Sequence, residues 1–316
     1  MKTLKCKISI GKYSFEYVVN LKIKHSVENL TRVCEIELPR KLEWKGKPVA
    51  LGNDSILNVG DKVTVKLSYN KTPEAVFKGY LARIKPGTRV GLVVEDEMYQ
   101  LKKNNIKKSW KKVKLSTVLA AVVPAGLTYE CPDISLGQLR LTNVSTAQVL
   151  EYLKMKYGLF SYIKNDKLLV GLAYWPEYAL RHIFHFQKNI ADDGHPEYRK
   201  SDSVKLKVKA ISIMSNNKKY DIEIGDSEGD QRTLYFYNVE KADLEQLANS
   251  EIKKLKYDGF RGKLKAFGEP LAQIGDIAVL QDDILPDRNG DYEIKANEIK
   301  FGSKGFKQII ELGNKV

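Results

Sequence analysis

The feature of this sequence that most constrains its fold is a series of short segments in which polar and apolar residues alternate, separated by turn residues. In the clearest one, LNVGDKVTVKLSY, the pair Gly60 and Asp61 precedes a run that alternates lysine, threonine or serine with valine or leucine. A period of two is that of a β-strand, so one face of each segment is expected to be buried and the other wet. Such segments fill residues 1–101 and return from about residue 200, which predicts a mainly β protein.

A lysine-rich segment, KKNNIKKSWKKVK at 102–114, breaks this pattern with seven lysines and no acidic residue. The periodicity after it is helical. Ser116 is a candidate cap for a short apolar helix, and Ser145 or Thr146 begins a second helix that Gly158 ends. A small α/β insert is therefore expected between two β-domains. The predicted domains are a first β-domain at 1–102, the insert at 103–175, and a connecting strand with a second β-domain at 176–316.

The second β-domain is expected to contain one helix, at about 240–258, ended by Gly259. Its apolar stripe is Leu244, Leu247, Ala248, Ile252 and Leu255. The net charge of +14 favours acidic partners, either nucleic acid or an anionic protein surface. No apolar run approaches the roughly 20 residues that span a bilayer, and the first twenty residues alternate instead of forming a signal peptide. We expect synthesis in the bacterial cytoplasm without stable membrane insertion.

Three groups of residues are candidate metal or catalytic sites. The cysteines Cys6, Cys34 and Cys131 are widely spaced and are expected to be buried thiols. A histidine-rich stretch contains His182, His185, Asp192, Asp193 and His195, but strand alternation places the first two histidines on opposite faces. An acidic loop contains Asp282, Asp283, Asp287 and Asp291, without the spacing of an EF-hand, and is expected to be a solvated hairpin loop. We therefore expect no metal, no cofactor and no catalytic residue.

The lysine run is the strongest local candidate for binding a partner. The possible interaction patch consists of Lys102, Lys103, Lys107, Lys108, Trp110, Lys111, Lys112 and Lys114. With the tryptophan interleaved, it could hold single-stranded nucleic acid by phosphate contacts and base stacking. The favoured interpretation is a solvated linker whose lysines keep a sheet edge from aggregating.

Two segments resemble the baseplate hub proteins of contractile-tailed phages. In VFKGYLARIKPGTRVGLVVEDEMYQLKKN, a Phe-x-Gly-Tyr strand, a second strand, an acidic turn and a short helix follow the hub pattern through Phe77, Gly79, Tyr80, Asp96, Met98 and Leu101. The C-terminal segment is also similar to the N-terminal halves of type VI secretion spike proteins. Its matching residues are, in order, Gly262, Leu264, Gly268, Pro270, Gly275, Asp276, Asn289, Gly290, Tyr292 and Ile294.

The residues that carry the resemblance are structural turn residues, not catalytic ones. Gly60–Asp61, Gly275–Asp276 and Asn289–Gly290 are dipeptides that tolerate positive φ and let strands reverse. The resemblance implies two similar tail-tube-like β-barrels in one chain, at 1–101 and roughly 200–316. Three subunits would then present six near-equivalent units in a ring, with the helix at 240–258 bracing the second barrel.

The resemblance also implies the function and the partners. It indicates a non-enzymatic structural protein of the virion tail baseplate, in a phage, prophage or related contractile injection system. This homotrimer would join the tail tube, or a tube-initiator protein, to the central spike. The chain ends at Val316 just after the closing strand, so a separate spike protein is expected. The tape-measure protein is a further candidate partner, and DNA would be met only in transit through the channel.

Three alternatives remain open from the sequence. In a hub, the lysine run could face the channel or an acidic neighbouring tail protein. A basic nucleic-acid-binding protein could use that run together with the strand face of Lys205, Lys207 and Lys209. A tail-associated cell-wall hydrolase is the third, although it lacks a credible acid/base pair.

Overall fold

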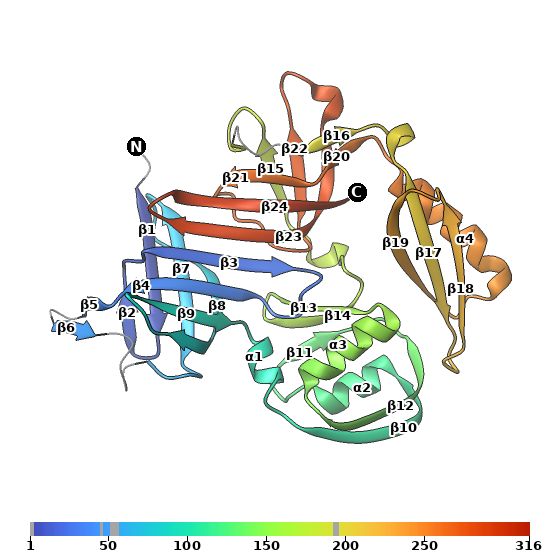
Figure 1. Ribbon diagram of the computed structural model, residues 1–316, viewed down its shortest axis with the longest axis horizontal. Coiled ribbons are helices and arrows are strands. Elements are labelled where there is room, and N and C mark those ends of the chain that lie inside the picture. The colour runs from blue at the N-terminus through green and yellow to red at the C-terminus, as the bar shows by residue number, and fades with distance from the viewer. Residues whose placement is uncertain (1–2, 45–46, 51–56, 192–195) are drawn as a thin grey trace. The chain divides into compact units, whose positions relative to one another are not determined.

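The computed structural model describes residues 3–44, 47–50, 57–191 and 196–316 (Figure 1). The chain divides into two compact units, each assembled from separated stretches. The first unit contains Met1–Gln100, Ala179–Pro196 and Gly262–Gly313, and the second contains Leu101–Tyr178, Glu197–Arg261 and Asn314–Val316. None of the helices in the described stretches is long and apolar enough to cross a membrane.

The first unit is built on a 12-stranded sheet. Ten of its strands follow the order β15-β22-β23-β3-β4-β9-β8-β7-β1-β2, while β24 pairs with both β21 and β23. The strands are β1 (Leu4–Ile10), β2 (Tyr13–Phe15), β3 (Asn20–Ser26), β4 (Val33–Pro39), β7 (Lys62–Tyr69), β8 (Glu74–Lys85), β9 (Arg89–Glu95), β15 (Arg181–His185), β21 (Lys263–Phe267), β22 (Ile277–Gln281), β23 (Gly290–Gly302) and β24 (Gly305–Lys315). A separate hairpin joins β5 (Lys41–Trp44) to β6 (Lys47–Ala50), and α1 (Met98–Leu101) follows β9.

The alternation seen in the sequence determines which side of this sheet is buried. On β7, Val63, Val65 and Leu67 are all buried. They lie opposite apolar residues of β1, with Val65 facing Ile8. Paired apolar side chains on one face are the main source of sheet stability, and here they form part of a hydrophobic core of the first unit. The predicted period-two strand is confirmed.

There is a steric reason for a glycine at position 79, in the Phe-x-Gly-Tyr motif of β8. A Cβ built at this position would lie 2.1 Å from the backbone oxygen of Glu95 on the neighbouring strand β9. Real Cβ atoms do not approach a backbone atom so closely, so only glycine lets the two strands come together here. The motif is therefore a packing requirement of the β8–β9 pair.

The two ends of the chain share one sheet. Strand β23 pairs with β22 from Gly290 to Glu293, and then with the N-terminal strand β3 from Ala296 to Gly302. Over the described residues the structure is mainly β but has no closed barrel, so the two expected barrels are not confirmed. The residues assigned to the second barrel are also split, because 206–255 belong to the second unit.

The two Gly-Asp turns nevertheless have the same local geometry. Gly60 has φ +97° and Gly275 has φ +71°, as predicted for turn glycines. The carboxylates of Asp61 and Asp276 each accept a hydrogen bond from the backbone N–H three residues earlier, at 2.8 and 2.9 Å. In both cases a strand follows directly, β7 after one turn and β22 after the other.

The backbone hydrogen bonds around these turns also correspond. Leu81 of β8 accepts from the N–H of Gly60 and donates to the carbonyl of Asp61. Ile294 of β23 makes the same two bonds with Gly275 and Asp276. The turn, the strand after it and the long strand that pairs with it thus form a unit that occurs twice in the first compact unit.

The connection from β22 to β23 is an exposed loop, as expected for the acidic segment. It passes through the 3-10 turn η3 (Pro286–Arg288), and Asn289 has φ −57°. The Asn289 side-chain oxygen accepts a hydrogen bond from the N–H of Asp282 at 2.7 Å, which closes the loop. The expectation of positive φ at Asn289–Gly290 is therefore wrong, because a longer loop needs no left-handed residue there.

The second unit contains a small α/β module, as predicted. Its elements are β10 (Ile106–Lys114), α2 (Leu115–Val122), β11 (Thr128–Glu130), β12 (Ser135–Val144), α3 (Thr146–Tyr157), β13 (Phe160–Lys164), β14 (Lys167–Gly171) and η1 (Pro176–Tyr178). Strands β10 and β12 form one sheet, and β11-β14-β13 form another. Ser145 caps α3 in a capping box with Gln148, and Gly158 ends this helix at φ +68°, so both predicted ends are confirmed.

The rest of the second unit is a three-stranded sheet covered by one helix. Its elements are β16 (Glu197–Arg199), η2 (Ser201–Ser203), β17 (Leu206–Ile213), β18 (Lys219–Gly225), β19 (Asp230–Tyr237), α4 (Lys241–Leu255) and β20 (Gly259–Arg261). Leu244, Ala248 and Ile252 form the buried stripe of α4, whereas Leu247 is 41% exposed. The helix ends at Leu255, and Gly259 opens β20 instead of ending the helix, which corrects the prediction.

Candidate functional site

The lysine run forms most of strand β10 and is not a solvated linker. Residues 106–114 pair antiparallel with β12, and the register shifts between Trp110 and Val113. This shift is a bulge that places one extra residue on β10, and bulges of this kind bend a strand and increase its twist. Ile106 and Val113 are buried and anchor the strand, while the lysines on it are exposed.

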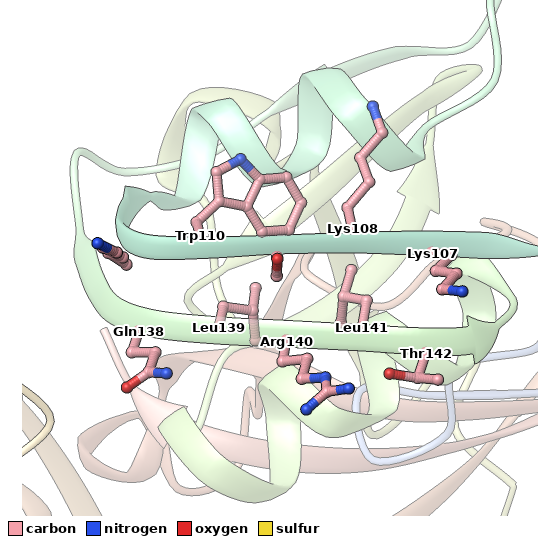
Figure 2. A pocket seen from close by; sticks show the side chains of 10 residues that line it. Lys107, Lys108, Trp110, Gln138, Leu139, Arg140, Leu141 and Thr142 are labelled. Atoms are coloured by element: carbon pink, nitrogen blue, oxygen red, sulfur yellow. The ribbon is translucent and has the colours of Figure 1, made fainter.

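The side chains of the two strands divide between two faces (Figure 2). Lys107 lies on the same side as Gln138, Arg140 and Thr142, whereas Lys108 and Trp110 lie on the side of Leu139 and Leu141. Leu139 and Leu141 are buried, so the second face is the inner one. The tryptophan thus packs half-buried on the inner face, away from the outward-facing cations.

An open groove of about 760 Å³ runs along this pair of strands. We call it the basic groove and define it by its lining residues Lys107, Lys108, Ser109, Trp110, Lys111, Gln138, Leu139, Arg140, Leu141 and Thr142. Of the predicted patch, Lys102, Lys103, Lys112 and Lys114 do not line it, and Lys114 instead pairs with Asp133 at 3.0 Å.

The sequence analysis missed the half of the groove that β12 supplies. Gln138, Arg140 and Thr142 are exposed and alternate with buried leucines. That alternation is visible in GQLRLTN and was the signal that could have found them. What the sequence could not show was that this strand pairs with the lysine run.

Two of the three lysines of the second predicted basic surface, the two that lie on β17, have their charge balanced. Lys207 forms an ion pair with Glu223 at 3.0 Å, and Lys209 pairs with Asp221 at 3.5 Å. Both acids come from the neighbouring strand β18. Balanced charges of this kind give little electrostatic attraction for phosphate, so this face does not support the nucleic-acid alternative.

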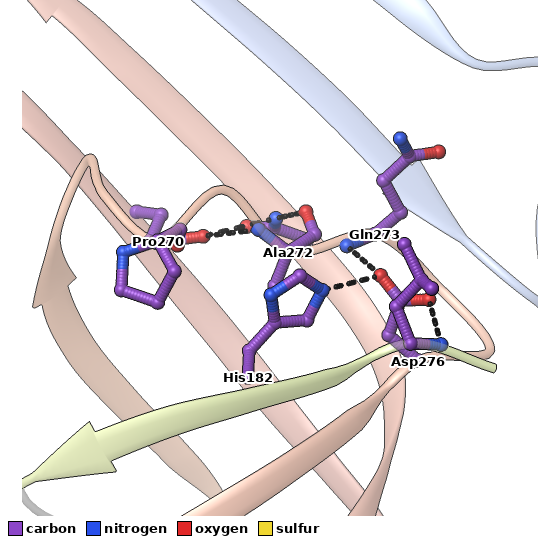
Figure 3. Close-up of polar contacts among 8 residues, drawn as sticks. His182, Pro270, Ala272, Gln273 and Asp276 are labelled. Carbon is purple, nitrogen blue, oxygen red and sulfur yellow. Dashed lines mark hydrogen bonds and ion pairs between the residues drawn. The ribbon is translucent and has the colours of Figure 1, made fainter.

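The histidines lie in structural contacts. His182 Nε2 is 2.9 Å from Oδ2 of the buried Asp276 (Figure 3). The other oxygen of this carboxylate accepts a hydrogen bond from the N–H of Leu180 at 3.1 Å, so Asp276 joins the Gly-Asp turn to the start of β15. His185 is buried and contacts Asp283 at 3.0 Å through Nε2, while its Nδ1 accepts from the N–H of Gln187.

These contacts do not assemble a metal site in the described part of the chain. No group of three or more histidine, cysteine, aspartate or glutamate side chains there could hold an ion. Asp192, Asp193 and His195 lie outside the described residues. His182 and His185 each face a different aspartate, as their predicted placement on opposite faces requires.

A buried polar cluster lies next to the Gly-Asp turn (Figure 3), and the sequence analysis did not identify it. Gln308 of β24 has no exposed surface. Its amide nitrogen donates to the carbonyls of Phe267 and Pro270, at 3.0 and 2.6 Å. Its oxygen accepts from the N–H of Ala272 and from the side chain of Asn297, both at 3.3 Å. One glutamine thus holds the segment that leads into the turn.

Asp96, from the acidic turn of the hub-like segment, is buried beside Arg32. The N–H of Met98 donates to its carboxylate at 3.2 Å, at the start of the short helix α1. Burial raises the pKa of Asp96 to about 7, although Arg32 and the N–H donors act in the opposite direction. Arg32 donates to the carbonyl of Val76 at 2.8 Å and lies over the ring of Phe77. The motif thus places a carboxyl group where protonation matters to the fold.

Comparison with known proteins gives likenesses of structure only. No family model and no curated protein matches the sequence. The 43 kDa tail protein of prophage MuSo2 from Shewanella oneidensis is similar over 99% of this chain and 97% of that chain, with 15% identity and a TM-score of 0.63. A tail protein from Neisseria meningitidis is similar over 99% of this chain and 96% of that chain, with 13% identity and a TM-score of 0.61.

A third solved structure links the fold to secretion machines. It is an E. coli component of the type VI secretion system that exhibits structural similarity to bacteriophage tail proteins. It covers 99% of this chain and 76% of that chain, with 8% identity and a TM-score of 0.58. The predicted resemblance is therefore confirmed at the level of the fold: this chain has the fold of phage tail proteins and of the related type VI secretion component.

Proposed function

We propose that the chain is a structural, non-enzymatic component of the tail of a phage, prophage or related contractile injection machine. The observation that carries this proposal is the likeness to the MuSo2 tail protein, which extends over nearly the whole of both chains. The polar side chains that the sequence offered as candidates support it, because His182, His185 and Asp283 are engaged in structural contacts.

Within such a machine, the chain acts as a homotrimeric baseplate hub that joins the tail tube to a separate central spike protein. The repeated unit of Gly-Asp turn, following strand and long paired strand supports this role, because one chain then offers two similar units. Three chains offer six, which reconciles threefold with sixfold symmetry. The protein would be located in the virion tail baseplate and assembled in the bacterial cytoplasm. The division into domains 1–102, 103–175 and 176–316 stays a prediction.

We expect the purified chain, mixed with the spike and tube proteins of the same machine, to form a complex with three copies of this chain. The mass of the complex, measured by light scattering during size exclusion, tests this expectation. The measurement should account for three chains of 35.9 kDa each. A stable complex with one, two or six copies would contradict the hub proposal. A monomer of the isolated chain is compatible with it, because the partners are then needed to close the ring.

We also expect His182→Ala and His185→Ala to lower the free energy of unfolding by only about 1–2 kcal/mol each, the usual cost of removing a hydrogen-bonding partner. The reason is that Asp276 keeps two backbone N–H donors and Asp283 is 70% exposed. Chemical unfolding measures the change, and zinc titration by calorimetry serves as the parallel test. Stoichiometric zinc binding that these substitutions abolish would show that the histidines form a metal site.

A further inference from the structure

The cations of the basic groove are not balanced by acids. On some other strands lysines lie opposite or beside acids, as in the pairs Lys207–Glu223, Lys209–Asp221 and Lys263–Glu311. In the groove, Lys107 lies opposite Thr142, and Arg140 lies opposite Ser109. Among the described residues, no ion pair is formed by Lys107, Lys108, Lys111, Lys112 or Arg140. Their charge is left for a partner.

The polar residues on the outward face of the groove are also suited to a negatively charged partner. Ser109, Gln138 and Thr142 are exposed beside Lys107 and Arg140. Hydroxyl and amide groups donate hydrogen bonds, and lysine and arginine can only donate. A concave surface that combines donors with uncompensated positive charge, and that lacks a carboxylate, is suited to an anionic partner with several acceptor oxygens.

Protection of a sheet edge does not fully account for this arrangement. Lysines and a bulge do prevent another strand from pairing with the edge of β10, and the bulge after Trp110 serves that purpose. Edge protection, however, requires neither Arg140 on the neighbouring strand nor a groove of about 760 Å³. Because strand addition is blocked, a partner must be recognised by side chains.

The position of Trp110 decides between two kinds of anionic partner, single-stranded nucleic acid and an acidic protein segment. Non-specific binding of single-stranded nucleic acid combines phosphate contacts with stacking of bases on aromatic side chains. Trp110 lies on the inner face with Leu139, and the outward residues Lys107, Gln138, Arg140 and Thr142 include no aromatic ring (Figure 2). The face of the groove that carries Lys107 and Arg140 therefore provides charge and hydrogen bonds without a stacking surface, which favours carboxylates over nucleotides.

We propose that the basic groove binds an acidic segment of a neighbouring protein, through aspartate or glutamate carboxylates that reach Lys107, Lys111 and Arg140. This proposal rests on the proposed function only in that a tail component is surrounded by other proteins. Ser109, Gln138 and Thr142 donate the additional hydrogen bonds that orient the segment. The extended groove and its spaced cations require several acids along the segment, not a single carboxylate.

A labelled peptide of alternating glutamate and serine is the probe, with a glutamine-serine peptide as its neutral counterpart. Binding is measured by fluorescence anisotropy on the full chain at low and at physiological salt. We expect the glutamate peptide to bind and the glutamine peptide not to bind. The double substitution Lys107→Glu/Arg140→Glu should weaken binding at least about tenfold, because two attractions become repulsions. Arg140→Gln alone, which changes an exposed side chain conservatively, should weaken binding about threefold.

The matched control is Lys241→Glu/Lys253→Glu on α4, which changes the net charge by the same amount at two exposed lysines outside the groove. It should leave peptide binding within about twofold, since exposed charges more than about 10 Å apart are screened at physiological salt. If the control weakens binding as much as the groove variant, only net charge is being measured and the inference is wrong. The inference would also be overturned if a single-stranded oligonucleotide bound as tightly as the peptide, or more tightly, and if the groove variant lost this binding. Either failure leaves the copy number in the tail complex unaffected, so the hub proposal is judged separately.

Discussion

Replacing Gln308 with alanine is expected to lower the free energy of unfolding by about 3–5 kcal/mol, because it removes a fully buried side chain that holds four polar partners. The carbonyls of Phe267 and Pro270 and the N–H of Ala272 would lose this partner in the protein interior. Each buried polar group left unsatisfied costs roughly 1–3 kcal/mol. Denaturant unfolding followed by circular dichroism measures the loss.

Two further variants separate the causes of this loss. Gln308→Met fills nearly the same volume without hydrogen bonds, so we expect it to lose most of the same free energy. Gln187→Ala removes an exposed glutamine that also bonds two partners, Asp282 and Asp283, and should cost less than about 1 kcal/mol. If Gln308→Met were as stable as the natural chain, the buried polar cluster would not be what holds the segment before the Gly-Asp turn.

The second large effect is a dependence of stability on pH that arises from Asp96. Burial raises its pKa in the folded chain to about 7, from 3.8 for an ordinary aspartate. Between these values the folded state keeps a proton that the unfolded state has released. The stabilisation of the fold by the protonated Asp96 is therefore fully present below about pH 4. It declines by up to about 1.4 kcal/mol per pH unit as pH rises, and it is lost as pH rises through about 7.

Asp96→Asn isolates this contribution, because an asparagine oxygen can still accept the N–H of Met98 and does not titrate. We expect the natural chain and the variant to be similar in stability near pH 5. At pH 8 the variant should be more stable by about 2–3 kcal/mol, since the natural chain then carries a buried charge. Urea unfolding of both chains over this pH range gives the difference. A variant that is less stable than the natural chain at pH 8 would mean that attraction between Asp96 and Arg32 outweighs burial.

Sequence patterns predicted the local structure where the signal lay within a few residues. Ser145 begins α3 because it and Gln148 form a capping box three residues apart, which can be read from the sequence. Ser116 was not a cap. Strand β10 runs directly into α2, so Lys114 occupies the capping position and Ser116 lies inside the helix. Where one element continues into the next, no separate cap marks the boundary.

Features that depend on distant segments could not be predicted. The pairing of β23 with β3 joins residues more than two hundred positions apart. No turn connects the two strands directly, so the sequence near either strand does not indicate which strand it pairs with. This pairing is the reason why the expected separation into two barrels is not confirmed. The lysine run has only Ile106 and Val113 as buried anchors, so its own sequence lacks the alternation of a strand. Pairing with β12 gives the lysine run its strand conformation, and β12 also supplies the outward-facing Arg140 beside it.

The Gly-Asp turns lie between these two cases. Both dipeptides were visible in the sequence, and both have the expected positive φ at glycine. Their matching contacts with Leu81 and Ile294 could not be read from the sequence, because each involves a strand that returns about twenty residues later. These contacts turn two similar dipeptides into a repeated structural unit, which is the main support for a ring with six near-equivalent positions.

The most direct test of the central claim is to locate and count this chain in the assembled particle. Electron cryo-microscopy of tails or injection machines from the native source, with the chain identified by its fold in the density, makes the measurement. We predict three copies in a ring at the junction between the tail tube and the central spike. Absence of the chain from the particle, or a position elsewhere along the tail, would contradict the account.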